Sequence, residues 1–388
     1  MSSRNTQLSC CREPESRREA KADSDHSLNS TPLGEIKQAR RSKCVSSVVV
    51  LMMILFVRGP GDLGFKEMSS PEPGQGQVLV QMKACGICGT DLRLFRRGEK
   101  VYPYFGHEFS GIVKSAGEDI EDLKKGDRVT AGLIETCGVC KPCHLGHPNF
   151  CEGMGDTLSP GGFAEECLVR HSPGSISLVR IPDDMDDVRA TLHEPLSCAL
   201  RIVRRANPQP GDTVLVYGLG AMGILSGILF RKSYPIKALI GVDINPSRVK
   251  KAEHLGFDLV ICADAPNFEE SIREMSEPDV VVEATGIAAV FPRVINLVRL
   301  GGKVVIAGVP EDVVEFSPLP IFRKELTILG AKGPFPYLNS NGGSEALETL
   351  RMGGLSTHEL VEAFPFDRAK EAFNAVFGGS VLKGVLTF

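Results

Sequence analysis

The chain has 388 residues, of which 42% are hydrophobic and 24% charged, with a formal net charge of −4. These values are typical of a soluble globular protein long enough for two domains, and no basic surplus points to a nucleic-acid partner. Most of the twelve cysteines are scattered along the chain. This pattern is unlike a short secreted disulfide scaffold and favours a reducing, cytoplasmic compartment.

Residues 1–47 are polar and mixed in charge, and they predict a disordered tail. The apolar run from Val48 to Val57 is about half the length of a membrane span, and no signal-peptide cleavage site is evident. We therefore expect a buried first strand and no membrane association, with an anchor or signal segment as the alternative. The ordered pattern begins near Met52 or Met53, and either is a candidate translation start.

The next part of the chain is rich in predicted strands. Short apolar runs at 76–85, 109–117 and 126–133 are separated by Gly and Pro turn signals, which predicts an all-β, barrel-like unit. After Pro208 apolar strands alternate with helical patterns, which is typical of βαβ units and a parallel sheet covered on both faces. Residues 364–388 then predict a helix and a closing strand.

A glycine-rich turn lies between the first strand and the first helix of the predicted parallel sheet. The segment VLVYGLGAMG places Gly218, Gly220 and Gly223 in a GxGxxG pattern that is typical of dinucleotide binding. Gly218 permits the tight turn, Gly220 lets the backbone approach a pyrophosphate, and Gly223 lets helix and strand pack closely. The helix N-terminus would then stabilise the phosphates through its free N–H groups.

A carboxylate follows at the end of the next predicted strand. Asp243 lies twenty residues beyond Gly223, where an acid binds the adenosine ribose. The same charge would repel a 2′-phosphate, so NAD is favoured over NADP, although the nearby Arg248 weakens that preference. The alternative is a surface aspartate on a sheet that binds no cofactor.

Four cysteines fall within the segment CGVCKPCHLGHPNFC, namely Cys137, Cys140, Cys143 and Cys151. Cysteines so close in sequence do not readily pair as disulfides, and the segment lacks the ending of a ferredoxin motif. Four thiolates suit a closed, tetrahedral zinc site, which has no open position for chemistry. His144 and His147 are left over, and we expect both to be exposed.

Three other segments combine Cys, His and Glu. They are KACGICGTD with Cys85 and Cys88, FGHEFSG with His107 and Glu108, and TLHEPLSC with His193 and Glu194. Taken singly, each has an ordinary structural explanation: a buried thiol, a satisfied polar contact, or an acid at a helix N-terminus.

Together the motifs GICGTD, GHE, the cysteine cluster, EPLS and GLGAMG follow the order found in zinc-dependent medium-chain dehydrogenases. Over roughly 50–388 the chain resembles this superfamily, and within it the polyol branch typified by sorbitol dehydrogenase. The resemblance implies a GroES-like barrel catalytic domain with an inserted Rossmann domain, a doubly wound parallel sheet that binds NAD. It divides the chain into the tail (1–47), a catalytic domain (48–200), the Rossmann domain (201–330) and a return to the catalytic domain (331–388).

The resemblance also implies two zinc ions. The catalytic one would be held by Cys88, His107 and an acidic third group, and the cysteine cluster would hold the structural one. Cys85 is not carried over as a ligand. Glu108 and Glu194 are both candidates for the acidic group, and the sequence leaves open which binds zinc directly and which binds through water.

Two further residues receive roles from the same motif. Thr90 is predicted to relay the proton of the alcohol, with a helix N-cap as the structural alternative. Asp91 is predicted to fix the tautomer of His107, with a first-turn helix acid as the alternative. Both residues can serve a structural and a functional role at once.

These features predict an NAD- and zinc-dependent dehydrogenase that oxidises a secondary hydroxyl of a polyol or sugar-like alcohol to a ketone. The resemblance implies a homodimer or homotetramer. Alternatives are a threonine-type or simple secondary-alcohol dehydrogenase and, from Arg96, Arg97 and Lys100, a sugar-alcohol-phosphate dehydrogenase, although a solvated basic loop is the favoured explanation of these three residues. A zinc-free quinone reductase or a non-catalytic protein of this fold is disfavoured, because all the metal-ligand residues are present.

Overall fold

The computed structural model of the protein describes residues 50–99, 105–132, 136–137, 139–153, 158–171, 177–310, 312–335, 337–338, 344–352 and 357–388. All of them belong to one unit, Val49–Phe388. The predicted tail at 1–47 and Lys100 lie outside the described residues. Among the described residues, no helix is both long and apolar enough to span a membrane.

One sheet is built mainly from the first half of the chain and runs in the order β15-β16-β3-β4-β5-β8, with β7 pairing β3 and β6. The strands of this sheet are β3 (Gln77–Gly86), β4 (Glu108–Ala116), β5 (Arg128–Ala131), β6 (Leu158–Ser159), β7 (Glu166–Arg170), β8 (Leu178–Arg180), β15 (Val361–Pro365) and β16 (Lys383–Thr387). The apolar runs at 76–85, 109–117 and 126–133 correspond to β3, β4 and β5, and the run at 48–57 begins β1 (Leu51–Gly59). A hairpin joins β1 to β2 (Asp62–Ser69), a strand that the sequence did not predict.

Aromatic packing fills the core of this sheet. The rings of Phe95, Phe105, Phe163 and Phe373 pack against one another with centroids 4.8–5.8 Å apart, mostly edge to face. Phe95 lies on α1 (Gly89–Arg97) and Phe373 on α12 (Ala369–Phe377). The packing therefore fixes two helices distant in sequence against the same sheet.

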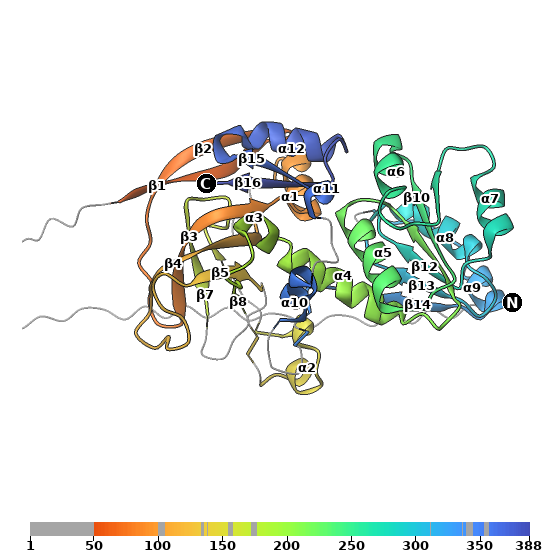
Figure 1. The fold of residues 1–388 in the computed structure, drawn as a ribbon, viewed down its shortest axis with the longest axis horizontal. Helices are drawn as coiled ribbons and strands as arrows, with labels where there is room; N and C mark the ends of the chain where they lie inside the picture. Colours follow the sequence, from red (N-terminus) through yellow and green to blue (C-terminus); the bar gives the residue numbers. More distant parts are fainter. Residues whose placement is uncertain are drawn as a thin grey trace, which may run out of the picture. The chain divides into compact units, whose positions relative to one another are not determined.

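The second sheet is entirely parallel, in the order β11-β10-β9-β12-β13-β14 (Figure 1). Its strands are β9 (Thr213–Tyr217), β10 (Ala238–Asp243), β11 (Leu259–Cys262), β12 (Val280–Glu283), β13 (Lys303–Ile306) and β14 (Thr327–Gly330). The helices between them are α5 (Ala221–Ser233), α6 (Pro246–Ala252), α7 (Phe268–Met275), α8 (Phe291–Leu297) and α9 (Leu319–Lys324). This order is that of a doubly wound dinucleotide-binding sheet.

Alternate residues of these strands enter two separate cores. On β9, Val214 and Val216 pack with α4 (His193–Ala206) and α5, whereas Leu215 and Tyr217 pack with α7 and α8. The sheet is thus covered on both faces, which explains its nearly continuous apolar strands.

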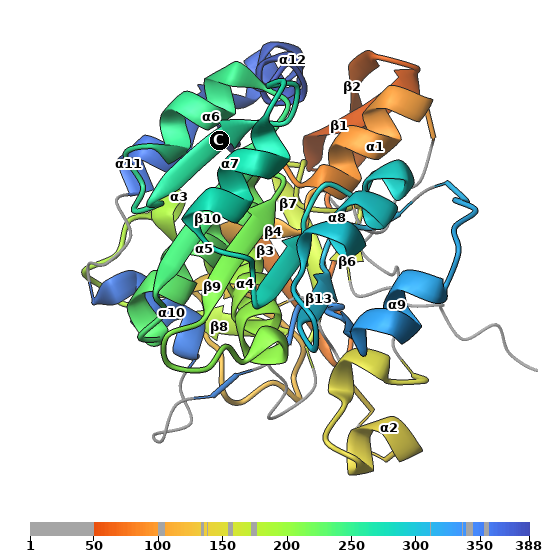
Figure 2. The same cartoon turned by 90° about the vertical axis from the view of Figure 1, so that its right-hand side faces the viewer.

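The C-terminal segment, drawn in blue, returns to the first sheet in Figure 1, and Figure 2 shows its helices from the side. After β14 come α10 (Glu345–Arg351), α11 (Thr357–Leu360), β15, α12 and β16, and β16 pairs with β3 so that Val385 lies opposite Gly86. The helix and closing strand predicted at 364–388 are α12 and β16. The remaining short helices are α2 (Lys141–His144) and α3 (Asp187–Ala190).

Candidate active site and metal centres

The residues predicted as catalytic metal ligands come together from two elements. Cys88 is the residue immediately before α1, and His107 and Glu108 lie where β4 begins. One ligand atom from each of the three lies within 4.8 Å of the others. His107 and Glu108 are buried and Cys88 is partly exposed, so the cluster is open on the thiol side. Cys85 is fully buried in β3, and burial raises the pKa of its thiol well above the usual value.

Asp91 ties the backbones of the ligand segments together. Its fully buried carboxylate accepts hydrogen bonds from the backbone N–H of Cys88 at 2.8 Å and of Gly106 at 3.1 Å. The separation from His107 Nδ1 is 4.0 Å, too long for a hydrogen bond. Asp91 is therefore a first-turn helix acid that also holds the two metal-ligand segments in place.

Thr90 is the second residue of α1 and is partly exposed. It is not the N-cap, because Cys88 occupies that position. Thr90 therefore lies two residues after Cys88 in the chain, on a partly exposed turn of α1.

Glu108 forms a buried ion pair with Lys383, the first residue of β16. The two meet above Gly86, where a methyl group in place of the glycine hydrogen would lie 2.4 Å from Glu108 Oε2 and 3.2 Å from Lys383 Cε. Lys383 Nζ also donates to the carbonyl of Ile87 at 3.0 Å. Burial alone would lower the pKa of Lys383, but Glu108 and Cys88 hold it above its usual value.

Glu194 lies in the first turn of α4 and is 5% exposed. Cys198, one helical turn further on, directs its thiol at Glu194 Oε1 at 3.4 Å. The preceding His193 is hydrogen-bonded through its two ring nitrogens to the Ala131 carbonyl at 2.9 Å and the Ser344 hydroxyl at 2.7 Å. Burial lowers the pKa of His193 to about 4, so this histidine is a neutral brace for the start of α4.

The electrostatics of the cluster suit a bound cation. Burial raises the pKa of Glu194 to about 6, and the nearby Glu108 charge adds to this effect. Burial alone would lower the pKa of His107, but Cys88, Asp91 and Glu194 hold it well above its usual value. A metal ion bound by thiolate, imidazole and carboxylate would displace these protons. The donor set, one sulfur, one nitrogen and carboxylate oxygen, is one that zinc accepts.

The four cysteines of the second cluster also converge. Neighbouring Sγ atoms are 3.4 Å apart for Cys140 and Cys143, 3.5 Å for Cys137 and Cys151, and 3.9 Å for Cys140 and Cys151. Thiolates bound to one tetrahedral zinc at about 2.3 Å would be about 3.8 Å apart, so the spacing fits. Backbone N–H groups of Val139 and Cys140 lower the pKa of Cys137 to about 6, which favours the thiolate.

The surroundings of this cluster agree with a closed site. His144 and His147 are both exposed, as expected, and neither belongs to the group of converging ligands. The four thiols therefore make up the whole donor set that the described residues offer here.

The glycine-rich turn has the geometry that the sequence predicted for dinucleotide binding. Gly218 adopts φ +105°, a left-handed conformation that favours glycine. A methyl group at Gly223 would lie 1.9 Å from the carbonyl of Gly218, so only glycine allows this helix and strand to approach. At Gly220, the N-cap of α5, a methyl group would meet only Arg248 Nη1, at 3.9 Å. The space in front of the helix N-terminus is thus open.

Asp243 ends β10 beside this turn and is 4% exposed. Its carboxylate accepts hydrogen bonds from the backbone N–H of Leu219 at 2.7 Å and of Asn245 at 2.8 Å. Arg248 Nη1 lies 3.7 Å from Asp243 Oδ2. Asp243, predicted to bind the cofactor ribose, and Arg248, predicted to weaken the preference for NAD, therefore form an ion pair in the structure.

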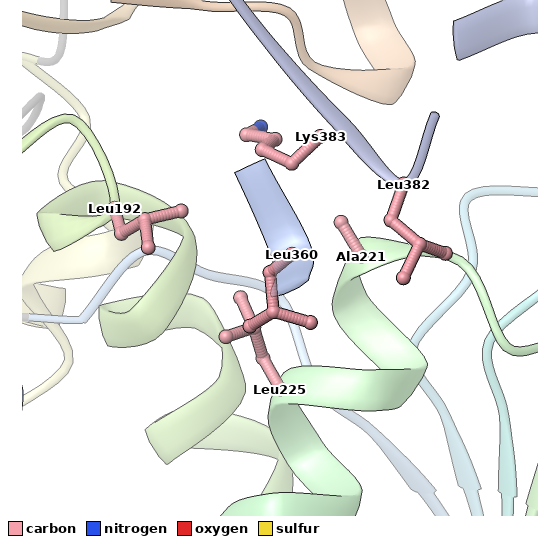
Figure 3. Close-up of a pocket in the computed structure, with 6 residues that line it drawn as sticks. All are labelled: Leu192, Ala221, Leu225, Leu360, Leu382 and Lys383. Carbon is pink, nitrogen blue, oxygen red and sulfur yellow. The ribbon is translucent and has the colours of Figure 1, made fainter. Parts of the chain in front are cut away.

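A small, mostly apolar recess lies at the N-terminus of α5 (Figure 3). It is lined by the following residues: Leu192, Ala221, Leu225, Leu360, Leu382 and Lys383. Ala221 is the first residue of α5, directly after the glycine-rich turn, and Lys383 is the partner of Glu108. The recess is thus lined by one residue that adjoins the glycine-rich turn and by one that contacts the metal-ligand cluster through its ion pair.

Comparison with known proteins agrees with this arrangement. Residues 74–183 match the alcohol dehydrogenase GroES-like domain, and residues 229–339 match the zinc-binding dehydrogenase family. D-arabinitol dehydrogenase 1 of Uromyces fabae is 31% identical over 355 residues, covering 86% of this chain and 96% of the relative. Probable D-xylulose reductase A of Arthroderma otae is 34% identical over 327 residues, covering 80% and 89%. The chain belongs to the zinc-binding dehydrogenase family.

Solved structures show the same fold. A short chain alcohol dehydrogenase from Escherichia coli CFT073, complexed with NADH, has a TM-score of 0.76 at 27% identity, with 87% of this chain and 99% of that chain covered. A zinc-binding dehydrogenase from Sinorhizobium meliloti 1021, bound to NADP, has a TM-score of 0.76 at 29% identity, covering 87% and 100%. The first sheet is therefore the GroES-like half-barrel and the parallel sheet the Rossmann fold. The chain is an oxidoreductase of the alcohol dehydrogenase type.

Sequence reasoning missed Lys383, although a signal was present. This lysine stands within the otherwise apolar run VLKGVLTF, and a charged residue inside a buried strand is a reason to look for a partner. Cys198 gave no such signal, because its role depends on its spacing from Glu194 along α4. Arg96 and Arg97 are exposed in the last turn of α1, where Arg97 pairs with Glu99 at 3.6 Å.

Proposed function

We propose that the protein oxidises a secondary hydroxyl of a polyol or sugar-like alcohol to a ketone, with hydride transfer to NAD⁺, and that the reaction is reversible. The observation that carries this proposal is the convergence of Cys88, His107 and Glu108, whose ligand atoms lie within 4.8 Å of one another, in a chain whose parallel sheet carries the glycine-rich turn. The hydride-donating carbon of the alcohol and the nicotinamide must be adjacent during the reaction, so the proposal requires the cofactor to extend from the glycine-rich turn toward this cluster.

We assign catalytic zinc to Cys88, His107 and an acidic group. Zinc supplies a Lewis acid that lowers the pKa of a bound hydroxyl, and NAD⁺ accepts the hydride. Glu108 is the better candidate for the direct acidic ligand, because its carboxylate lies within the three-ligand cluster while Oε2 also faces Lys383. Glu194, which lies outside that group but close enough to raise the pKa of His107, would then act through water.

The remaining residues hold groups or move a proton. The hydroxyl of Thr90, on the accessible turn after Cys88, takes the proton that the alcohol loses and passes it toward solvent. Asp91 keeps the Cys88 and Gly106 backbones fixed, so that the cluster does not reorganise during the reaction. The four cysteines Cys137, Cys140, Cys143 and Cys151 would hold the structural zinc and saturate it.

The cofactor assignment rests on Asp243. Its carboxylate lies beside the nucleotide turn and would accept hydrogen bonds from the ribose hydroxyls, which favours NAD. Arg248, 3.7 Å away, would moderate the repulsion of a 2′-phosphate, so the preference for NAD over NADP is expected to be partial.

The setting of the enzyme is part of the same proposal. We infer a cytoplasmic homodimer or homotetramer, with catalytic residues in 48–200 and 331–388 and cofactor residues in 201–330. Several large apolar side chains are exposed on and around α9, among them Phe322 at 80% and Val313 at 95%, and this surface is available for a second copy of the chain.

A substrate panel tests the proposal. Zinc-replete protein would be incubated with NAD⁺ and sorbitol, xylitol, threonine, a sugar-alcohol phosphate or a simple secondary alcohol, and NADH absorbance would be recorded. We expect a polyol to give the highest kcat/KM. The highest value with threonine or with the phosphate would favour one of those alternatives, and no NADH with any alcohol would contradict the proposal.

A further inference from the structure

The four-cysteine lobe contacts a segment that adjoins the active-site helix. Asn149 lies within the lobe, two residues before Cys151, and is 1% exposed. Its side-chain amide donates a hydrogen bond to the carbonyl of Lys332 at 3.0 Å. Residues 331–335, which directly follow β14, are called the strap below.

A second contact joins the lobe to the same point of the strap. The ammonium group of Lys332 lies over the ring of Phe150, 5.5 Å from its centroid. Both side chains are exposed, so this cation–π contact is weak. The hydrogen bond donated by the buried Asn149 is therefore the stronger of the two connections.

The strap packs directly on α4 at the next residue. A methyl group at Gly333 would lie 2.6 Å from Cys198 Sγ and 2.9 Å from Cys198 Cα. Only glycine allows this approach without displacement of one backbone. Cys198 in turn directs its thiol at Glu194 Oε1 at 3.4 Å, so one residue separates the strap from the active-site carboxylate.

Helix α4 presents a row of side chains that holds the strap along its length. Arg201 lies over the ring of Phe335 at 4.5 Å, and Arg205 Nε donates to the carbonyl of Gly330 at 3.2 Å. Glu194, Cys198, Arg201 and Arg205 follow helical spacing and so lie on one face. The face of α4 that carries Glu194 is thus also the face on which the strap rests.

We propose that Asn149 is a positioning residue for the catalytic centre: by fixing Lys332 it holds the strap against Cys198 and thereby orients the Glu194 carboxylate. The inference rests on the proposed function, because it requires that Glu194 belongs to a zinc centre. Through this contact the lobe would influence the catalytic centre indirectly, although its own saturated four-thiolate site takes no part in the reaction.

The positioning role of Asn149 and a purely structural role predict different measurable effects. A hydrogen bond that only anchored the lobe would affect retention of the four-cysteine zinc and the thermal stability. A positioning role instead affects the catalytic centre, since partners outside the ligand shell typically change metal affinity or activity by about 10–100-fold. Zinc release from the catalytic site is the decisive measurement, because it requires neither substrate nor cofactor.

The experiment compares four full-length proteins: wild type, Asn149→Ala, Gly333→Ala and Asn267→Ala. Gly333→Ala adds a methyl group that meets Cys198, so it disturbs the contact between the strap and α4 without changing a residue of the lobe. Asn267→Ala is the matched control, since Asn267 is exposed at the start of α7 and its side chain does not cap that helix. For each protein we would measure zinc per chain, the rate of zinc transfer to a chelator with a coloured indicator, the thermal midpoint, and kcat and KM with the best polyol.

Both Asn149→Ala and Gly333→Ala are expected to release the catalytic zinc about tenfold faster and to lower kcat by about tenfold. They should keep the slowly released zinc of the cysteine lobe, and Asn267→Ala should match wild type. Unchanged catalytic zinc release and kcat in folded Asn149→Ala would overturn the proposal, and so would unchanged values in Gly333→Ala if Asn149→Ala fails to fold. If wild-type protein contained only the zinc of the cysteine lobe, the proposed function would fail together with this proposal. This result therefore distinguishes a failure of both proposals from a failure of the positioning role alone.

Discussion

Lys383 and Glu108 form an ion pair whose side chains are only 4% and 2% exposed, at the meeting point of β16, β3 and β4. The pair connects residues 275 positions apart in the chain and places a fixed positive charge beside the predicted zinc ligands. Because each ion is buried, removal of one leaves the other uncompensated.

Lys383→Met should therefore destabilise the protein by about 3–5 kcal/mol, as measured by urea unfolding. The double variant Lys383→Met with Glu108→Gln should recover a large part of this loss, because no buried charge remains. Lys370→Met is the control: Lys370 pairs with Asp62 at 2.9 Å on the surface, and its loss should cost about 1 kcal/mol or less. Equal unfolding midpoints for the single and double variants would show that the pair is not coupled.

The two cysteine sites should lose zinc independently. The Cys88→Ser variant is expected to bind about one zinc fewer per chain and to lose turnover. Its thermal midpoint should stay close to that of wild type, because the catalytic zinc site has an open coordination position and does not close a lobe. Cys140→Ser should also lose about one zinc, but with a lower thermal midpoint, since a closed four-thiolate site stabilises the lobe. Metal analysis and differential scanning calorimetry on both proteins check this. A lowered midpoint in Cys88→Ser alone would reverse the assignment.

The two candidate acids can be separated by isosteric substitution. Glu108→Gln should reduce zinc affinity at the catalytic site more than Glu194→Gln does, because the Glu108 carboxylate lies among the ligand atoms of Cys88 and His107. Removal of a carboxylate that contacts zinc only through water typically changes zinc affinity or activity by about 10–100-fold, and removal of a direct ligand changes them by more. Competition with a zinc chelator of known affinity gives both values. The opposite order would make Glu194 the direct ligand.

The charge of Asp243 sets the cofactor preference in the proposed function. Asp243→Asn removes the negative charge that would face a 2′-phosphate. It keeps one acceptor oxygen, for one of the two N–H groups of Leu219 and Asn245, which bond to different oxygens of the carboxylate. We expect the ratio of kcat/KM for NADP⁺ to that for NAD⁺ to rise by about tenfold, which corresponds to about 1.4 kcal/mol. Asp264→Asn, an exposed change, should leave the ratio unaltered.

The parts of this site that could be predicted are those encoded by local patterns. Periodicity predicted β3, β4, β5 and the parallel sheet, and the motifs singled out Cys88, His107 and Glu108, which the fold brings within 4.8 Å. Strands β2, β6, β7 and β8 were missed because they are short or alternate polar and apolar residues, and tertiary pairing defines them.

The contacts that could not be predicted depend on long-range packing. Lys383 meets Glu108 because β16 pairs with β3, and nothing in either segment encodes that register. The same is true of Asn149 and Lys332, which are 183 residues apart. A hydrogen bond between two loops leaves no periodic trace in the sequence, so only the folded chain reveals it.

Alanine substitutions of Gly223 and Gly220 in the glycine-rich turn should have two different effects. Gly223→Ala would place a methyl group 1.9 Å from the Gly218 carbonyl, so the helix must move away from the strand, and both stability and NADH binding should fall. Gly220→Ala meets no protein atom closer than 3.9 Å, so the fold should remain intact while the methyl group occupies the space of the pyrophosphate.

Fluorescence titration with NADH and urea unfolding separate these outcomes. We expect Gly220→Ala to bind NADH at least about tenfold more weakly with an unchanged unfolding midpoint, because its steric conflict exists only with ligand present. Gly59→Ala is the control, since a methyl group there has open space around it and Gly59 is remote from the turn in sequence. Normal NADH affinity in Gly220→Ala would mean that the dinucleotide does not approach α5 at its N-terminus, and the cofactor site would have to be placed elsewhere.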